Sequence, residues 1–177
     1  MNRIVYFADR AVAFAAAAPG GEWHAVRAAD GVTRAKILKI LESYNSVAVL
    51  SPDPEAAFAA FAAEFTPVEA AGGIVVNGRG EGLEACAERE IAEETGVRAR
   101  VVRPLCRTLH AYWFPKTERW ELKRTSWYEL RTEGAEPLTP QREEGIEQVV
   151  WCTEAEAADR VRGAFPTIRC VAEAMRR

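Results

Sequence analysis

The sequence is poor in the residues that build disulfide frames, zinc sites and membrane spans. Of its 177 residues only two are histidine and four are cysteine, and the cysteines form no CxxC pair: Cys86, Cys106, Cys152 and Cys170. This spacing indicates neither a zinc site nor a dense disulfide frame, and it favours a reducing, cytoplasmic compartment. The apolar run over residues 11–18 is too short to span a bilayer, and Asp9 before it argues against a secretory signal.

The sequence also has no large excess of positive or negative charge. The formal net charge is -3, which provides no broad basic surface for neutralising a nucleic-acid backbone. Hydrophobic residues make up 49% of the chain and charged residues 28%, which is typical of a globular protein. We therefore expect one compact body, or a domain with a small one appended, that has neither nucleic acid nor a membrane as a partner.

The first 66 residues predict a small α/β piece. Residues 4–7 and 46–50 have the composition of short strands, and residues 32–43 have the periodicity of an amphipathic helix. Asp53 and Pro54 suit the start of a second helix, which should run to about Phe65. The alanine-rich patches are also expected to be helical. The predicted order is thus βαβα-like, with a boundary near residue 66.

The remainder of the chain mixes predicted strands and helices, so that the expected fold class is α/β (α+β). A β-branched run within residues 68–76 indicates a strand, and two aromatic segments, 105–114 and 120–131, indicate a hairpin. Residues 148–152 suggest one more strand. Thr153 and Glu156 have the spacing of a capping box, which predicts a helix, and residues 166–177 are expected to form the last one.

The most informative segment is a glutamate-rich helix predicted over residues 83–95, with Gly96 placed to end it in a left-handed cap. On a helical wheel its acidic residues and the preceding Glu81 fall into two opposite groups, Glu81, Glu84 and Glu88 against Glu90, Glu93 and Glu94. Within the second group, Glu90 and Glu94 flank an apolar stripe at positions 83, 87 and 91, which should face the core.

These three carboxylates crowd the C-terminal end of the helix, where the helix dipole disfavours negative charge. Arg89 can reach Glu93 at i,i+4 spacing, but one arginine does not balance three carboxylates. Oxygen ligands without histidine or cysteine select a hard cation such as Mg²⁺, which takes further ligands from water and phosphates. The competing interpretation of such a helix is a merely solvated acidic face.

Residues 81–97 resemble the Nudix box, G-x5-E-x7-R-E-U-x-E-E-x-G-U, in which U is aliphatic. Eight specified positions are in register: Glu81, Arg89, Glu90, Ile91, Glu93, Glu94, Gly96 and Val97. The resemblance implies a Nudix hydrolase whose residues 67–177 form an α/β/α sandwich with a mixed sheet. Residues 1–66 would then be a small appended subdomain of unknown role.

The same resemblance implies roles for individual residues. Glu90 and Glu94 would be the principal ligands of Mg²⁺ or Mn²⁺, Glu93 a further ligand or water-positioning group, and Arg89 the residue that orients the carboxylates. A later catalytic base would lie in the loop 141–147, as Glu144 or Glu143, although a solvated acidic turn is the competing interpretation. The implied reaction is attack of water on a phosphorus of a nucleoside diphosphate joined to another group. The implied partner is a nucleotide-type small molecule, and a homodimer is one assembly to test.

One departure from the family pattern concerns the segment before the helix. Val75 occupies the position of the box's opening glycine, and only residues 78–82 separate the preceding strand from the helix. A strand, a turn and a second strand that the family places there are absent from the sequence. This departure motivates an alternative function, a weakly active or inactive Nudix-like module that binds or senses a nucleotide. In a third alternative, residues 1–66 are the functional part and the Nudix region is scaffold.

The predicted hairpin contains further candidates for ligand binding. Its aromatic side chains include candidates for stacking on a nucleobase, although packing within the core or hairpin competes: Tyr112, Trp113, Phe114, Trp120 and Trp127. Arg107, Lys123 and Arg124 are candidates for phosphate contact, with an exposed strand face as the other interpretation.

Overall fold

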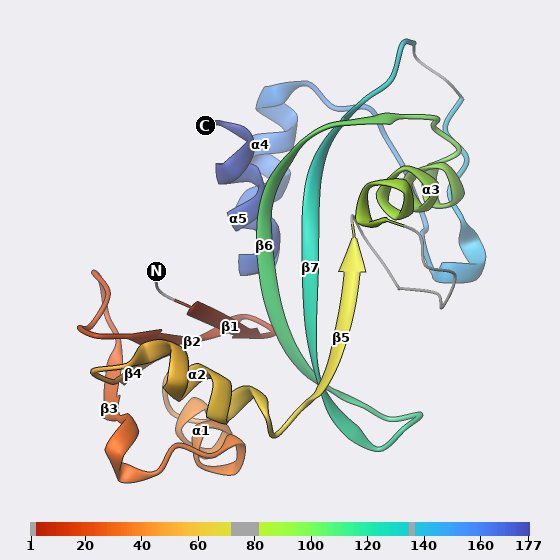
Figure 1. Cartoon of the computed structure of the whole chain (residues 1–177). Helices are drawn as coiled ribbons and strands as arrows, with labels where there is room; N and C mark the ends of the chain where they lie inside the picture. Colours follow the sequence, from red (N-terminus) through yellow and green to blue (C-terminus); the bar gives the residue numbers. More distant parts are fainter. Residues whose placement is uncertain (1–2, 72–81, 135–136) are drawn as a thin grey trace. The chain divides into compact units, whose positions relative to one another are not determined.

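The computed structural model describes residues 3–71, 82–134 and 137–177 (Figure 1). Within these residues one sheet contains seven strands: β1 (Arg3–Phe7), β2 (Arg10–Ala15), β3 (His24–Arg27), β4 (Ser46–Leu50), β5 (Thr66–Ala71), β6 (Arg100–Phe114) and β7 (Arg119–Arg131). Five α-helices accompany them: α1 (Arg34–Leu41), α2 (Pro54–Ala62), α3 (Leu83–Thr95), α4 (Glu154–Arg162) and α5 (Pro166–Met175). The strand order is β3-β4-β2-β1-β6-β7-β5, with parallel and antiparallel pairs. The predicted mixed α/β class is confirmed.

The chain divides into two compact units. The first unit comprises Met1–Pro67 together with Leu109–Lys123, and the second comprises Val68–Thr108 together with Arg124–Arg177. The end of the β6–β7 hairpin therefore belongs to the same unit as the N-terminal residues, which was not predicted from the sequence. None of the helices among the described residues is long and apolar enough to cross a membrane.

Strand β2 lies at the centre of the first unit. It pairs antiparallel with β1, where Val5 faces Val12, and parallel with β4, where Val12 faces Val47. The prediction that alanine-rich patches are helical was wrong here. Small side chains fit a strand that has a neighbour on each side, and this pairing overrides the helical preference of alanine. The first 66 residues consequently form the order βββαβα instead of βαβα.

Phenylalanines from α2 and the neighbouring strands form the core of the first unit. Phe61 is fully buried, with its ring centroid 5.3 Å from that of Phe14 and 5.1 Å from that of Phe65. Helix α2 begins as predicted, because the Asp53 side chain accepts a hydrogen bond from the Ala56 N–H and Pro54 occupies the first turn. This core positions the hairpin end, since Trp120 packs against it.

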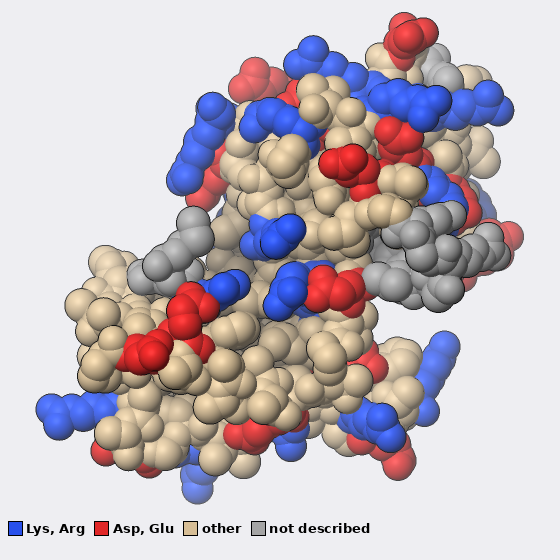
Figure 2. All heavy atoms as spheres, in the orientation of Figure 1, with Lys and Arg blue, Asp and Glu red and all other residues tan. Residues whose placement is uncertain are grey.

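The second unit is built around α3, which has the predicted bounds and ends in a left-handed Gly96. Cys86 and Ala87 of α3 are buried against Val101 of β6 and Tyr128 of β7. Figure 2 shows acidic and basic side chains interspersed over the visible face, in keeping with the small net charge.

Residues 148–152, expected to form a strand, have no regular secondary structure. Val150 is 40% exposed and Trp151 56% exposed, so the segment lacks the buried face that its apolar composition suggested. A strand also needs a hydrogen-bonded neighbour, and the strands of the described sheet leave this segment out. The helix that follows, α4, has the predicted capping box between Thr153 and Glu156.

Thr153→Ala is expected to lower the free energy of unfolding by about 1 kcal/mol, because it removes the side chain that caps the N–H of Glu156. Urea denaturation of the two proteins measures this difference. Thr117→Ala, in the exposed hairpin turn, serves as the control and should change the stability by less than about 0.5 kcal/mol. Equal stability of Thr153→Ala and wild type would contradict the capping role.

Candidate functional site

The acidic residues of α3 differ in their burial. Glu90 is only 8% exposed and lies on the same inward face as Cys86 and Ala87. Glu94, one turn later on this face, is half-buried, whereas the side chain of Glu93 is 48% exposed. The helix therefore directs one carboxylate into the protein, which is costly unless a cation or hydrogen-bond donors accompany it.

Arg89 provides positive charge to two of these carboxylates. Its Nη2 lies 2.7 Å from Oε1 of Glu90, and its Nη1 lies 2.6 Å from Oε2 of Glu93. The exposed pair with Glu93 contributes little stability by itself, about 0.3–0.5 kcal/mol for such an i,i+4 pair. The pair with Glu90 matters more, since removing Arg89 would leave a buried carboxylate without this partner.

The loop with the candidate base starts at the C-terminal end of α3. The Thr139 N–H donates to the carbonyl of Thr95 at 2.8 Å, and the Gln141 N–H donates to the carbonyl of Glu94 at 3.1 Å. These bonds satisfy carbonyls that the helix end would otherwise leave unpaired. The 3-10 turn η2 (Arg142–Glu144) follows directly, with Glu143 and Glu144 both exposed. Hydrogen bonds thus connect the end of α3 to the segment that leads into η2, although the two are far apart in the sequence.

A model of the NUDIX domain family matches residues 53–171, which is more than half of the 177-residue chain. The chain belongs to the Nudix family. The matched range contains all of α3 and the loop 141–147. Family membership supports a Nudix-type hydrolase in general, and the predicted family and fold are confirmed.

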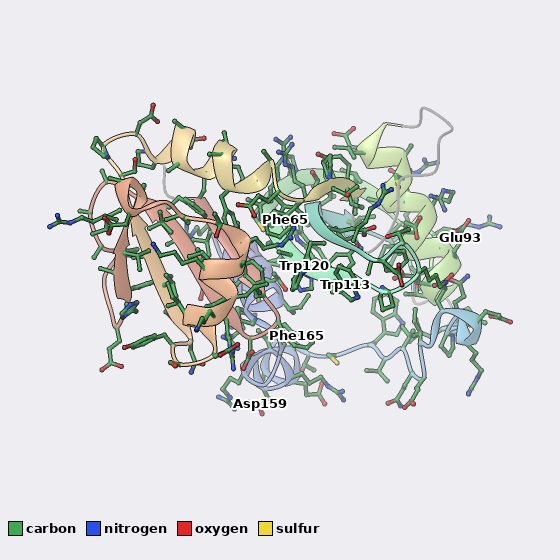
Figure 3. All side chains as sticks on the ribbon, turned by 90° about the horizontal axis from the view of Figure 1, so that it is seen from below. Phe65, Glu93, Trp113, Trp120, Asp159 and Phe165 are labelled. Atoms are coloured by element: carbon green, nitrogen blue, oxygen red, sulfur yellow. The ribbon has the colours of Figure 1, made fainter. Side chains whose placement is uncertain are left out.

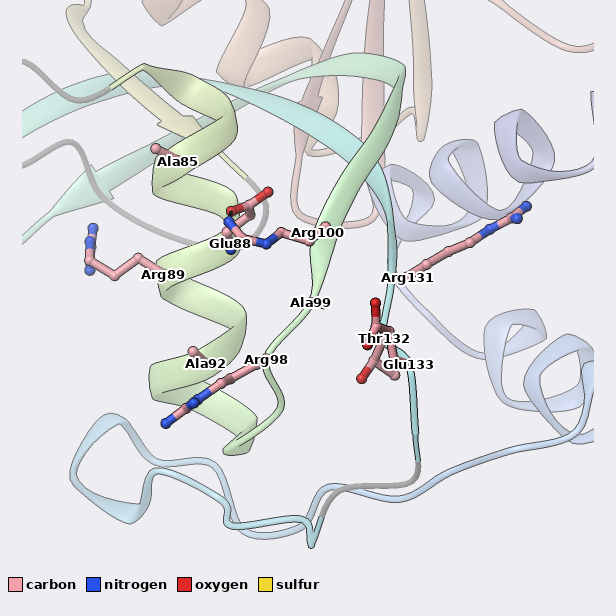
Figure 4. A pocket seen from close by; sticks show the side chains of 10 residues that line it. All are labelled: Ala85, Glu88, Arg89, Ala92, Arg98, Ala99, Arg100, Arg131, Thr132 and Glu133. Atoms are coloured by element: carbon pink, nitrogen blue, oxygen red, sulfur yellow. Dashed lines mark hydrogen bonds and ion pairs between the residues drawn. The ribbon is translucent and has the colours of Figure 1, made fainter.

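On the outer side of the Nudix helix α3 lies a cavity of about 600 Å³ (Figure 4). Ala85, Glu88 and Ala92 line it from the helix, and Arg100 reaches toward Glu88 from β6. The guanidinium of Arg100 lies 3.0 Å from the Glu88 carboxylate, which also accepts a hydrogen bond from the Val101 N–H at 2.9 Å. Glu88 thus ties α3 to β6, a role that its place on the helical wheel did not reveal.

The Val101 N–H, together with Arg100, holds the pKa of Glu88 below its ordinary value of 4.5. Because the folded pKa is the lower one, this stabilisation is present above pH 4.5 and is lost as the pH falls through the folded pKa. Glu88→Gln is therefore expected to have a lower Tm than wild type at pH 7, with the difference shrinking by pH 3. Thermal unfolding at both pH values measures this, and a difference that persists unchanged at pH 3 would contradict it.

The donor atoms on α3 suit the hard divalent cation that Nudix enzymes typically use. They are carboxylate oxygens, with Glu90 and Glu94 one turn apart on the same face. In the ranges that the structure describes, no three His, Cys, Asp or Glu side chains converge closely enough to hold a metal ion. Glu81 and the departure at Val75 fall within residues 72–81 and so lie outside the described residues.

Proposed function

We propose that this Nudix protein is a Mg²⁺- or Mn²⁺-dependent pyrophosphohydrolase that acts on a nucleoside diphosphate joined to another group. The observation that carries the proposal is the placement of the box glutamates on α3. Glu90 is buried on the inward face, Glu94 follows one turn later, and Arg89 contacts both Glu90 and Glu93. Family membership supports the reaction class.

In this proposal Glu90 and Glu94 hold the cation, and Glu93 is a further ligand or positions the attacking water. Arg89 keeps the carboxylates oriented through its two ion pairs of 2.7 Å and 2.6 Å. A bound divalent cation supplies charge for the phosphate oxygens and lowers the pKa of a coordinated water. The chain's own contribution would be oxygen donors carried on one helix, of which Glu90 and Glu94 share the inward face.

We also propose Glu144, with Glu143 as the alternative, as the base that accepts a proton from the attacking water. The hydrogen bond from the Gln141 N–H to the Glu94 carbonyl supports this role, because it starts the loop beside the turn of α3 that carries Glu94. Two further proposals are a domain boundary near residue 66 and a cytoplasmic location. The wide spacing of the four cysteines, with no CxxC pair, favours this location.

A screen of nucleotide-linked diphosphates with Mg²⁺ or Mn²⁺, analysed by mass spectrometry, tests this function. We expect a nucleoside monophosphate and a phosphorylated second product, no turnover in EDTA, and recovery when the metal is restored. Reactions in ¹⁸O-labelled water identify the attacked phosphorus, because the label enters only the product that contains it. Absence of product with either metal, across the screen and over long incubation, would refute the proposal. Ligand-induced thermal stabilisation in that case would support the binding-module alternative.

A further inference from the structure

The first unit contains a pocket of about 350 Å³. Its lining includes the rings of Phe65, Trp113 and Trp120 and the side chains of Arg34 and Arg119. All of these residues belong to the first unit, so the pocket uses no residue of α3. The volume is at the lower end of the range for small-molecule sites, roughly 300–1,000 Å³.

The three rings meet edge to face, with Trp120 between the other two (Figure 3). The ring centroid of Trp120 lies 6.4 Å from that of Phe65 at 88°, and 6.2 Å from that of Trp113 at 62°. Trp120 and Phe65 pack into the core of the unit, whereas Trp113 remains 47% exposed. Trp113, about half-exposed in the lining of the pocket, therefore offers ring surface on which a flat ring could stack.

Arg34 brings positive charge to the same pocket. Its guanidinium carbon lies 5.7 Å from the Phe65 ring centroid and 5.9 Å from that of Trp120. Its Nη1 donates to the carbonyl of Glu64, which fixes the side chain in place. The Glu64 carboxylate accepts a hydrogen bond from the backbone N–H of Arg34 at 3.1 Å. This bond pairs the first N–H of α1. Arg119 adds a second, exposed guanidinium to the lining, which also includes the acidic residues Glu64 and Glu118.

We propose that this pocket is a separate nucleotide-binding site, in which a nucleobase stacks on Trp113 and the phosphate lies near Arg34 and Arg119. The half-exposed Trp113 ring suits a flat ring, and the guanidinium groups of Arg34 and Arg119 can donate to an anion attached to it. A lining carboxylate such as Glu118 can accept hydrogen bonds from the hydroxyl or amino groups of a nucleoside. This site adds a binding function to the first unit and does not depend on hydrolysis by the second.

Titration of the full chain with AMP in EDTA, followed by tryptophan fluorescence, tests the proposal, with adenosine and inorganic phosphate as comparison probes. We expect saturable quenching by AMP, and weaker binding of adenosine and phosphate. Trp113→Ala should raise the Kd for AMP about tenfold or more, since one stacking partner is lost. Arg119→Gln should raise the Kd for AMP and leave that for adenosine unchanged.

Trp151→Ala is the matched control, because Trp151 is 56% exposed and lies in the second unit. It should keep the affinity of wild type for AMP. If circular dichroism shows Trp113→Ala to be misfolded, Trp113→Phe, which keeps a ring, replaces it and should show a smaller rise in Kd. No saturable AMP binding, or a wild-type Kd in the folded Trp113 variant, would overturn the proposal whether or not the protein hydrolyses diphosphates.

Discussion

Glu94→Gln is expected to lower kcat for metal-dependent hydrolysis about 100-fold or more while the protein stays folded. The amide has nearly the same shape as the carboxylate but no charge, so it is a much poorer ligand for a hard cation. A bound metal provides several kcal/mol of transition-state stabilisation, and each 1.36 kcal/mol corresponds to a factor of ten in rate. Glu94 lies one turn after the buried Glu90 on the inward face of α3, so the two proposed ligands are on the same side of the helix.

Glu84→Gln is the matched control, because Glu84 is an exposed glutamate on the same helix and lies outside the inward group. Steady-state kinetics across a range of Mg²⁺ concentrations should show activity close to wild type for Glu84→Gln and almost none for Glu94→Gln. Thermal unfolding in EDTA should give the same Tm for wild type and Glu94→Gln within a few degrees. Wild-type kcat in a folded Glu94→Gln would rule out Glu94 as a metal ligand.

Gly96→Ala is expected to lower the free energy of unfolding by about 2–4 kcal/mol. Gly96 has a φ of 78°, where an L side chain costs roughly 1–2 kcal/mol. A Cβ there would also lie 3.2 Å from the Cβ and 3.3 Å from the backbone nitrogen of Thr139. Thr139 cannot move away without loss, because its N–H is bonded to the Thr95 carbonyl at 2.8 Å. Overpacking of this kind costs typically 1–3 kcal/mol.

Alanine variants of two other glycines distinguish the effect of the positive φ from the effect of the steric contact with Thr139. Gly145 has a φ of 77° with no atom near the position of a Cβ, so Gly145→Ala should show only the conformational part, about 1–2 kcal/mol. Gly163 has a φ of -90° and open space, so Gly163→Ala should change the stability by less than about 0.5 kcal/mol. Urea denaturation ranks the three variants, and a Gly96→Ala protein as stable as Gly163→Ala would contradict the argument. For a chain of this length the expected fall in Tm for Gly96→Ala is roughly 4–16 °C.

Gly96→Ala also tests how the loop 141–147 depends on the end of α3. If the added methyl displaces Thr139, the hydrogen bond from Gln141 to the Glu94 carbonyl should weaken with it. We then expect the folded variant to lose turnover as well as stability, in contrast to Gly163→Ala.

The sequence by itself determined the features that depend on near neighbours. Helix α3 was predicted with its bounds because strong helix formers fill it and Gly96 provides a left-handed end. The starts of α2 and α4 were predicted from capping side chains, each of which accepts a hydrogen bond from the N–H three residues later. The register of the box residues likewise identified the family that the domain match confirmed.

Only the tertiary structure decided the features that depend on distant partners. Strand β2 is extended because β1 and β4 flank it, whereas residues 148–152 have no strand beside them in the described sheet. Glu88 is tied to Val101, and the Gln141 N–H to the carbonyl of Glu94, across separations that no local pattern encodes. Hydrogen-bond pairing and burial between remote segments carry no periodic signal in the sequence. For this reason the Nudix box in α3 could be predicted from the sequence. The contacts that support α3 and the aromatic pocket of the first unit could not.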